Sequence, residues 1–339
     1  MTAIKARAVQ VPAPEAPLEV VTREVPDPGP GEVRLRIQAC GVCHSDVFSL
    51  SGASAYPRVP GHEVAGVIET LGPGVTAWSV GQRVGVGWYG GADGTCDACR
   101  RGDRIDCPHL RVPGLTDDGG YAEAMVVPAE ALAAIPDGLS PVEAGPLMCA
   151  GVTTYNGLRR SDARAGDLVA VLGMGGLGHL GLQFANRMGF EVVALARGEE
   201  RRPVAKELGA HHYVDTTAEN PAEALQRLGG AAVVLATVTS APAMAAALPG
   251  LRARGQLIIL GVDTEPVPVS PLDLVSASRT VVGHASGTSK DSEDTLRFAV
   301  LSGVRPLVET MPLERAADGQ ARMLSGQARF RVVLTTGQP

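Results

Sequence analysis

The sequence has few aromatic residues, no excess of positive charge and no long apolar run, and each absence excludes a class of protein. Aromatic residues make up only 4% of the 339 positions, so the cores must consist mainly of Val, Leu, Ala and Ile. The net charge of −6 excludes a broadly basic surface for nucleic acid or an anionic membrane. The sequence contains no run of about 18 or more apolar residues, the length needed for a helix to span a membrane. Because the start of the chain does not resemble a signal segment, we expect a cytoplasmic location.

The pattern along the chain predicts two domains, because 339 residues exceed the usual size of one domain. Residues 1–150 contain short β-type runs such as Val33–Ala39 and Val64–Thr70, separated by turns rich in Pro and Gly. From Leu168 onward, apolar strands alternate with helical segments such as Gly176–Met188, which is typical of a parallel α/β sheet. The candidate strands there are Leu168–Leu172, Glu191–Ala196, Ala231–Ala236, Gln256–Gly261 and Thr280–Gly283, followed by a helix, Ser292–Leu301, and a closing strand, Phe330–Leu334.

A glycine-rich turn lies between the first two of these strands. The segment Gly173-Met-Gly175-Gly-Leu-Gly178 follows a strand and opens a helix, as in Rossmann dinucleotide-binding units. Its glycines allow a tight turn, so that the helix N-terminus can face a pyrophosphate. The alternative is a βα turn with a structural role alone. We assign dinucleotide binding to Gly173, Gly175, Gly176, Leu177 and Gly178.

The end of the second strand bears on the choice of cofactor. An acidic residue is expected there when the ribose hydroxyls of NAD are bound. This chain has Arg197 instead, and Glu199 and Glu200 follow only beyond the strand end. Because Arg197 can pair with a 2′-phosphate, we favour NADP(H). The alternative is NAD(H), with Arg197 facing solvent.

Six cysteines without a signal-like segment are more typical of metal or redox sites than of a disulfide framework. Cys43 lies in Gly41-Val-Cys-His-Ser-Asp46, His62 in Gly61-His-Glu63, and Cys149 in Leu147-Met-Cys149. Spacing alone does not join these motifs. Together with the glycine-rich turn they resemble the zinc-dependent alcohol dehydrogenases of the medium-chain dehydrogenase/reductase superfamily. The resemblance covers essentially the whole chain, with the motifs in the family's order.

The resemblance implies a fold and a metal centre. The expected fold class is α/β: a Rossmann doubly wound parallel sheet over residues 151–285, and a β-rich GroES-like catalytic domain formed by residues 1–150 and 286–339. The implied catalytic Zn²⁺ is bound by a family ligand set: Cys43, His62 and Cys149, with Glu63 as an alternative or transient ligand. Asp46 would accept a hydrogen bond from His62 and so orient its imidazole. The alternative for Asp46 is a helix N-terminal carboxylate.

Residues near this centre acquire roles by the same resemblance. Ser45 is the hydroxyl that bonds the substrate oxygen and passes its proton outward. Several relatives continue this relay with a histidine three positions later, where this chain has Phe48. His44 or water would then complete the proton path, and His44 could instead contact the pyrophosphate.

Four further residues are expected around the substrate and the cofactor, and three of them, Trp88, Thr153 and Arg331, match family positions. Trp88 and Phe48 would line a narrow substrate pocket, and the alternative for Trp88 is ordinary packing. Thr153 would contact the nicotinamide. Arg331 would contact the pyrophosphate, the alternative being a surface ion pair.

A second cluster follows Trp88. The family carries four cysteines in this loop around a structural zinc, and the chain has Asp93 in place of the first. Either the carboxylate completes a tetrahedral site, or the site is weakened or empty; the three retained thiols favour the first interpretation. The expected ligands of the structural Zn²⁺ are Asp93, Cys96, Cys99 and Cys107.

The leading prediction is an alcohol dehydrogenase or aldehyde reductase that transfers a hydride between a small primary or secondary alcohol and NAD(P)⁺. A polyol or aryl-alcohol dehydrogenase on the same scaffold is the alternative within enzymes. A non-catalytic nucleotide-binding protein is the alternative from another class. By resemblance we expect a homotetramer or homodimer, with no nucleic-acid or membrane partner.

Overall fold

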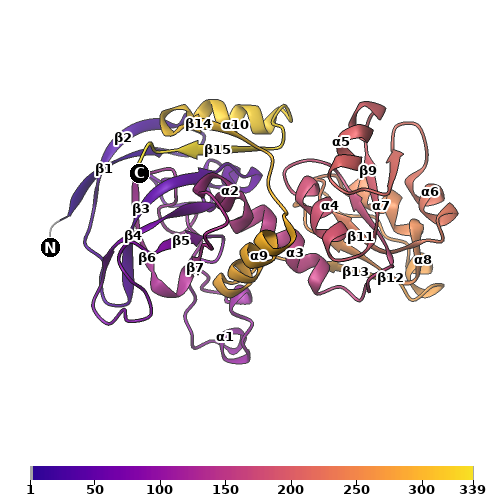
Figure 1. Cartoon of the computed structure of the whole chain (residues 1–339), viewed down its shortest axis with the longest axis horizontal. Helices are drawn as coiled ribbons and strands as arrows, with labels where there is room; N and C mark the ends of the chain where they lie inside the picture. The colour runs from indigo at the N-terminus through magenta and orange to yellow at the C-terminus, as the bar shows by residue number, and fades with distance from the viewer. Residues whose placement is uncertain (1–2, 339) are drawn as a thin grey trace. The chain divides into compact units, whose positions relative to one another are not determined.

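The computed structural model describes residues 3–338 and divides the chain into two compact units (Figure 1). The first unit runs to Val152 and also contains Ser286–Leu301 and the chain from Pro306 onward; the second comprises Thr153–Ala285 and Ser302–Arg305. The domain limits at residues 150 and 285 stay a prediction of the sequence analysis. Among the described residues, no helix has the length and apolar character needed to cross a bilayer.

The first unit is built on a seven-stranded sheet with the order β14-β15-β3-β4-β5-β7, in which β6 also pairs with β3. All its pairs are antiparallel except β14 with β15. Strand β15, from the C-terminal end of the chain, lies beside β3, with Leu334 opposite Cys40 (Figure 1). The strands, with the separate pair β1-β2, are β1 Ile4–Gln10, β2 Glu19–Val25, β3 Glu32–Gly41, β4 Val64–Leu71, β5 Arg83–Val86, β6 Ala124–Pro128, β7 Leu132–Ala134, β14 Val308–Pro312 and β15 Arg331–Thr335.

The core of this sheet is aliphatic, as the scarcity of aromatic residues predicts. Leu35 and Ile37 of β3 and Ile68 of β4 are fully buried, and the aromatic ring among them belongs to Tyr121. Cys40 is also part of this core. The helical segments of the unit are η1 His44–Ser49, α1 Asp97–Arg101, η2 Arg104–Asp106, η3 Ala129–Ala131, α2 Pro141–Pro146, the π-helical η4 Leu147–Gly151, α9 Ser289–Ser302, η7 Leu313–Arg315 and α10 Ala316–Leu324.

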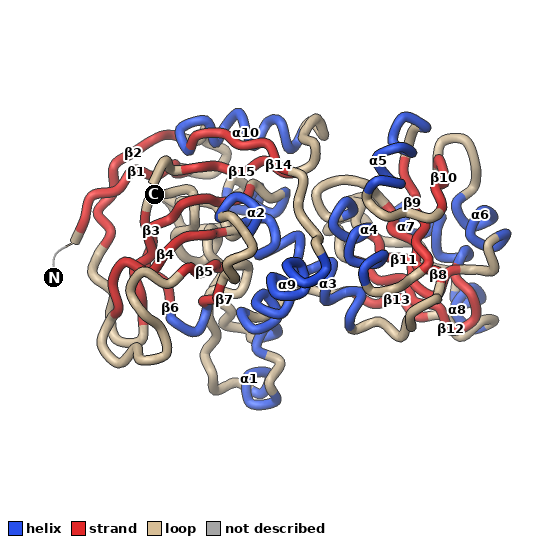
Figure 2. Tube along the Cα trace, in the orientation of Figure 1, coloured by secondary structure: helices blue, strands red, loops and turns tan. Residues whose placement is uncertain are grey.

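The second unit contains a six-stranded sheet with the order β10-β9-β8-β11-β12-β13, all of it parallel. Numbered from its first strand, this is the 3-2-1-4-5-6 order of the Rossmann fold, which confirms the predicted doubly wound sheet. Figure 2 shows helices alternating with its strands along the chain. The strands are β8 Leu168–Leu172, β9 Glu191–Ala196, β10 His212–Asp215, β11 Ala231–Ala236, β12 Leu251–Ile259 and β13 Thr280–Gly283; the helices are α3 Val152–Arg159, α4 Gly178–Arg187, η5 Glu199–Arg201, α5 Arg202–Glu207, α6 Pro221–Arg227, α7 Ala241–Ala247, η6 Leu248–Gly250 and α8 Pro271–Val275.

The predicted strands β8, β9, β11 and β13 have the bounds read from the sequence. Strand β12 begins five residues earlier than predicted, and β10 was not predicted at all. Strand β10 has the sequence His212-Tyr-Val-Asp215, in which polar residues flank the two apolar ones. It lies at the edge of the sheet.

Candidate active site and second metal centre

The first unit brings together four side chains that are far apart in the sequence. Ligand atoms of Cys43, His62, Glu63 and Cys149 all lie within 4.8 Å of one another. Cys43, His62 and Glu63 are buried, whereas Cys149 is partly exposed. Cys149 lies in the π-helical segment η4, an irregularity that is frequent at functional sites. These are the four residues that the resemblance implied.

The spacing of the two sulfur atoms suits a shared metal ion. Cys43 Sγ and Cys149 Sγ are 3.8 Å apart. A disulfide would need about 2 Å between them. Two thiolates at about 2.3 Å from a tetrahedral Zn²⁺ stand about 3.8 Å apart. The pair therefore fits two corners of a zinc tetrahedron.

The imidazole of His62 presents one nitrogen to a carboxylate and leaves the other without a partner. Nδ1 lies 3.0 Å from Asp46 Oδ1, while the buried Nε2 has no hydrogen-bond partner in the described part of the chain. A buried nitrogen without a partner costs about 1–3 kcal/mol, and metal-binding imidazoles commonly pair their second nitrogen with a carboxylate. The donor set therefore fits a Zn²⁺ ion.

Asp46 is held by further hydrogen bonds. Its Oδ2 accepts one from the Cys43 backbone N–H at 2.9 Å and one from the Tyr121 hydroxyl at 2.8 Å. The carboxylate is buried and lies where the sequence analysis expected it, beside His62. Tyr121 was missed, because it lies 75 residues from Asp46 in the chain and no motif links the two.

The two sulfurs have opposite tendencies to ionise. The hydrogen bond to Cys149, aided by the neighbouring His62, holds the pKa of the Cys43 thiol well below its usual range, although burial opposes this shift. The same hydrogen bond, together with burial, raises the pKa of Cys149. Of the two thiols, Cys43 therefore loses its proton at the lower pH.

Glu63 forms a buried ion pair with Arg331. Arg331 Nη2 donates to Glu63 Oε1, and also to the Val42 carbonyl oxygen at 2.9 Å. Burial raises the pKa of Glu63 to about 8, and the charge of Arg331 opposes that rise. A Cβ at Gly41 would lie 1.9 Å from Glu63 Oε2, so a glycine is required there for the carboxylate to fit.

Two consequences follow for the predicted roles of this pair. Arg331 is only 4% exposed, so the alternative of a surface ion pair is wrong; its contact with a pyrophosphate stays a prediction. Within the described residues, Glu63 Oε2 has no hydrogen-bond partner. Because a Glu63 oxygen belongs to the ligand cluster, the carboxylate can serve as the alternative ligand.

The other predicted residues of the first unit lie close to this cluster in the chain or in space. Short helix η1 carries His44, which is exposed, and Ser45 and Phe48, which are half-buried. The Trp88 ring meets the His62 ring edge-on, with centroids 5.0 Å apart and an interplanar angle of 87°. Trp88 therefore packs directly on a candidate ligand. Thr153 belongs to the second unit, where it is buried in α3.

The glycine-rich turn of the second unit has the geometry of a phosphate cradle. Gly173 has a φ of +98°, and a Cβ at Gly178 would lie 2.0 Å from its carbonyl oxygen. A Cβ at Gly175 would meet no described atom within 4 Å. The first and third glycines are thus required by packing, whereas Gly175 leaves open space before the ten-residue helix α4. Such space admits a pyrophosphate.

The loop after β9 exposes charges of both signs, those of Arg197, Glu199 and Glu200. Arg197 is exposed and has no ion pair among the described residues. Glu199 pairs with Arg202, and Asp215 Oδ1 accepts a hydrogen bond from the Gly198 N–H at 2.9 Å. Arg201 was not predicted to act here; its Nη1 donates to the Met174 carbonyl oxygen in the glycine-rich turn at 3.1 Å. No spacing rule connects that arginine to the turn.

The second cluster forms a compact loop in the first unit. Cys96 Sγ lies 3.7 Å from Cys107 Sγ, again the separation expected across a zinc tetrahedron. Asp93 Oδ1 accepts hydrogen bonds from the N–H groups of Thr95 and Cys96 at 2.8 and 3.0 Å, which lower the pKa of this carboxyl. Ligand atoms within 4.8 Å of one another are offered by Asp93, Cys96, Cys99 and Cys107.

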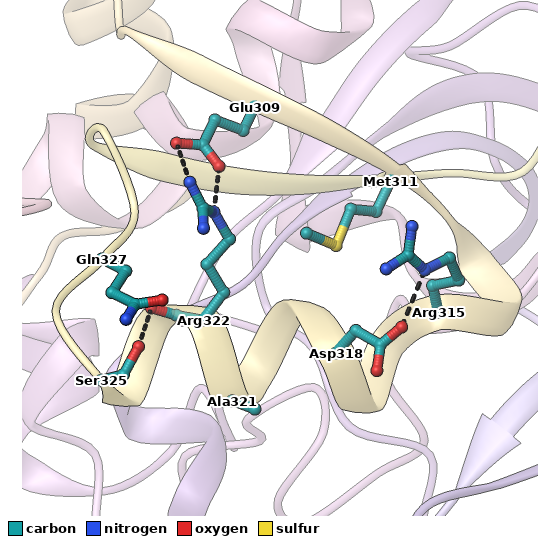
Figure 3. A pocket seen from close by; sticks show the side chains of 8 residues that line it. All are labelled: Glu309, Met311, Arg315, Asp318, Ala321, Arg322, Ser325 and Gln327. Atoms are coloured by element: carbon teal, nitrogen blue, oxygen red, sulfur yellow. Dashed lines mark hydrogen bonds and ion pairs between the residues drawn. The ribbon is translucent and has the colours of Figure 1, made fainter.

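An open hollow between β14 and α10 contains none of the predicted site residues (Figure 3). Its charged side chains satisfy one another: Arg322 Nη2 donates to Glu309 at 3.1 Å, and Arg315 Nε donates to Asp318 at 2.7 Å. The hollow therefore offers no free charge to a ligand.

Comparisons with known proteins agree with this geometry. Residues 29–137 match the Alcohol dehydrogenase GroES-like domain, and residues 176–300 match the Zinc-binding dehydrogenase family. The chain is 41% identical over 321 residues to alcohol dehydrogenase notN of Aspergillus sp. (strain MF297-2), covering 94% of each chain. It is 41% identical over 323 residues to an alcohol dehydrogenase of Geobacillus stearothermophilus, covering 94% of this chain and 96% of the relative.

A solved structure is similar along its whole length. The cobalt- and zinc-bound thermostable alcohol dehydrogenase of Pyrobaculum aerophilum is 30% identical, with a TM-score of 0.87, covering 98% of this chain and 100% of that one. A GroES-like domain joined to a Rossmann domain defines a dinucleotide-dependent oxidoreductase. The chain belongs to the zinc-dependent alcohol dehydrogenases of the medium-chain dehydrogenase/reductase superfamily. It is an alcohol dehydrogenase, and neither the aryl-alcohol alternative nor the non-catalytic alternative is favoured.

The glycine-rich turn yields a paired prediction. Gly175→Ala places a methyl group in open space, so we expect normal thermal stability but at least about tenfold weaker dinucleotide binding, because a Cβ occupies the cradle. Gly178→Ala drives a Cβ into backbone and should lower the unfolding temperature as well. Cofactor titration calorimetry and thermal unfolding measure both. Undiminished binding by Gly175→Ala would contradict the assignment.

Proposed function

We propose that the catalytic zinc of this alcohol dehydrogenase is bound by Cys43, His62 and Cys149, and that Glu63 is its alternative ligand. The observation that carries this proposal is the unpartnered Nε2 of buried His62 beside two sulfurs 3.8 Å apart. Two thiolates would neutralise the charge of the ion, and Arg331 compensates the charge of Glu63. The ligand set leaves one position for the substrate oxygen.

The chemistry then divides between the bound groups and the side chains. When bound, zinc lowers the pKa of an alcohol or polarises a carbonyl, and the nicotinamide accepts or returns the hydride. Ser45, half-buried two residues after Cys43, accepts the substrate proton and passes it outward. Phe48 cannot continue this relay, because its ring has no atom that can accept and release a proton. His44, which is exposed in the same short helix, or water takes the proton on.

The substrate pocket is narrow in this proposal. Trp88 packs on His62, and Phe48 is partly exposed on η1. Two aromatic side chains near the ligands favour small or slender primary and secondary alcohols and aldehydes. Thr153 is proposed to contact the nicotinamide, and the turn Gly173–Gly178 and Arg331 to contact the pyrophosphate.

We propose NADP(H) as the preferred cofactor, with NAD(H) as the alternative. The support is local charge: Arg197 is exposed with no described ion-pair partner, whereas Glu199 is already paired with Arg202. A 2′-phosphate would thus meet an available guanidinium, which binds phosphate through charge-assisted hydrogen bonds.

The second cluster is proposed to hold a structural zinc with one oxygen and three sulfur ligands. The 3.7 Å separation of two of its sulfurs and the ordered carboxylate of Asp93 support this assignment. One Asp93 oxygen is engaged by backbone N–H groups, so the other serves as the ligand.

The oligomeric state and the location of the protein are also proposals. We propose a cytoplasmic homo-oligomer, either a dimer or a tetramer, in which copies pair through the edge strand β13. Val282 on β13 and Leu272 and Val275 on α8 are apolar and exposed. Edge strands with exposed apolar residues are sites of association.

Removing a proposed zinc ligand should abolish turnover without loss of the cofactor. In Cys43→Ala and His62→Ala we expect kcat to fall at least about 10³-fold, because a Lewis acid contributes several kcal/mol to the transition state. Dinucleotide binding, measured by fluorescence titration, should change little. An unchanged kcat in either variant would refute the ligand assignment.

Reversing the charge after β9 should change cofactor preference. In Arg197→Asp we expect the NADP⁺-to-NAD⁺ ratio of kcat/KM to fall about tenfold to a hundredfold, since a charged hydrogen bond contributes about 1.5–3 kcal/mol. Arg187→Asp, which makes the same charge change at an exposed position on α4, is the control. Equal ratios in the two variants would exclude a 2′-phosphate role for Arg197.

Loss of the Asp93 carboxylate should affect the second metal only. Asp93→Ala should bind one of two zinc ions at least about tenfold more weakly and unfold at a lower temperature, because a structural metal adds its binding free energy to folding. Asp97→Ala, at the start of α1 and outside the ligand cluster, is the control. Zinc content is measured by metal analysis and stability by thermal unfolding. If both are unchanged in Asp93→Ala, Asp93 is not a ligand of this site.

A charge at the proposed interface should separate the copies. We expect Val275→Asp to lower the mass measured by light scattering, because a buried unpaired carboxylate opposes association. Leu301→Asp changes an equally exposed residue of α9 and should leave the mass unchanged. The interface assignment fails if the two variants keep the same mass.

A further inference from the structure

Tyr121 lies beneath the proposed zinc site without being one of its ligands. Its side chain is fully buried in the core of the first unit. Its hydroxyl donates to Asp46 Oδ2 at 2.8 Å, and the other oxygen of that carboxylate lies 3.0 Å from Nδ1 of His62. A chain of contacts therefore runs from the phenol through the carboxylate to the imidazole.

The backbone around Tyr121 supports the same ligand by a second route. Segment 119–121 pairs with segment 59–61, which leads directly into His62. The N–H groups of Gly119, Gly120 and Tyr121 donate to the carbonyl oxygens of Val59, Gly61 and Pro60 at 2.7, 2.9 and 2.9 Å. These three hydrogen bonds hold the backbone that leads into His62 against the segment that carries Tyr121.

The aromatic ring packs against the backbone immediately before His62. A Cβ at Gly61 would lie 2.5 Å from Tyr121 Cδ1, so the ring occupies the space that a side chain would fill. Gly61 also has a φ of +101°, a conformation that favours glycine. The glycine thus allows the phenol to approach closely enough to reach Asp46.

From these contacts we propose that Tyr121 is a positioning residue: its hydroxyl holds the Asp46 carboxylate, and through it the His62 imidazole, in the orientation that directs Nε2 to zinc. The inference rests on the proposed catalytic zinc site. Asp46 Oδ2 accepts from two donors, the Cys43 N–H and the Tyr121 hydroxyl. One carboxylate therefore contacts both the backbone of Cys43 and the imidazole of His62, and the tyrosine hydroxyl holds that carboxylate in place.

The expected effect is on metal affinity. Removing the hydroxyl leaves one buried carboxylate oxygen with a single donor, so Asp46 can rotate and the imidazole loses its fixed direction. Loss of an outer hydrogen-bond partner typically weakens metal binding by about tenfold to a hundredfold. Tyr121→Phe removes only the oxygen and keeps the ring against Gly61.

The experiment titrates metal-free protein with Zn²⁺ against a chromophoric chelator. Each of the two proposed sites should give its own phase of the binding curve. Cys43→Ser protein should retain only the phase of the Asp93-containing site, so the phase that it lacks belongs to the catalytic site. We expect Tyr121→Phe to weaken that phase about tenfold and to leave the other phase unchanged. Tyr56→Phe is the control, because its hydroxyl donates instead to the Ser49 carbonyl oxygen at 2.9 Å and should leave both phases unchanged.

A double-mutant cycle distinguishes positioning through Asp46 from a general structural effect. In an Asp46→Asn background, Tyr121→Phe should weaken zinc binding by less than about twofold, because the carboxylate through which it acts is gone. Two additive losses would overturn the inference. An unchanged zinc affinity in Tyr121→Phe would overturn it too. So would failure of that variant to fold, because the hydroxyl would then be needed for folding rather than for positioning. If wild-type protein has no zinc phase that Cys43→Ser lacks, the proposed function itself fails.

Discussion

The contact between Asp46 and His62 is the constraint on which the site depends. An imidazole can turn either nitrogen toward a metal, and a buried carboxylate decides between them by engaging Nδ1. Asp46 is itself held by the Cys43 N–H and the Tyr121 hydroxyl. The orientation of a single ring is thus determined by groups from two separate parts of the chain, the segment Cys43–Asp46 and Tyr121. Without them, Nε2 would have no defined relation to the two sulfurs.

Charge balance is the second constraint on this centre. A carboxylate as deeply buried as Glu63 is strongly disfavoured in its ionised form unless a cation accompanies it. Arg331, from the last strand of the chain, supplies that cation and is itself held by the Val42 carbonyl oxygen. The pairing of β15 with β3 therefore does more than extend the sheet, since it brings a positive charge to a cluster of acidic ligands.

Local patterns were sufficient to predict much of the second unit. Strands β8, β9 and β11 were predictable because buried parallel strands are continuous apolar runs. Strand β13 was also predicted, although it is a mostly exposed edge strand whose apolar residues are Val281 and Val282. Strand β10 was missed because its two apolar residues, Tyr213 and Val214, lie between the polar residues His212 and Asp215. Arg201 and Tyr121 were missed for a different reason: each acts through a hydrogen bond to a residue far away in the chain, and neither residue type is unusual at its position.

The sequence by itself determined the order of the motifs, the residue types capable of binding zinc, and the glycines that a dinucleotide turn requires. Its resemblance to a family joined those motifs, although their spacing did not. Only the tertiary structure decided that Cys43, His62, Glu63 and Cys149 share one sphere, that Arg331 is buried against Glu63 rather than exposed, and that Tyr121 supports Asp46. The reason is physical: ligand geometry depends on how distant strands pair and pack, and a one-dimensional pattern records only local preferences of the chain.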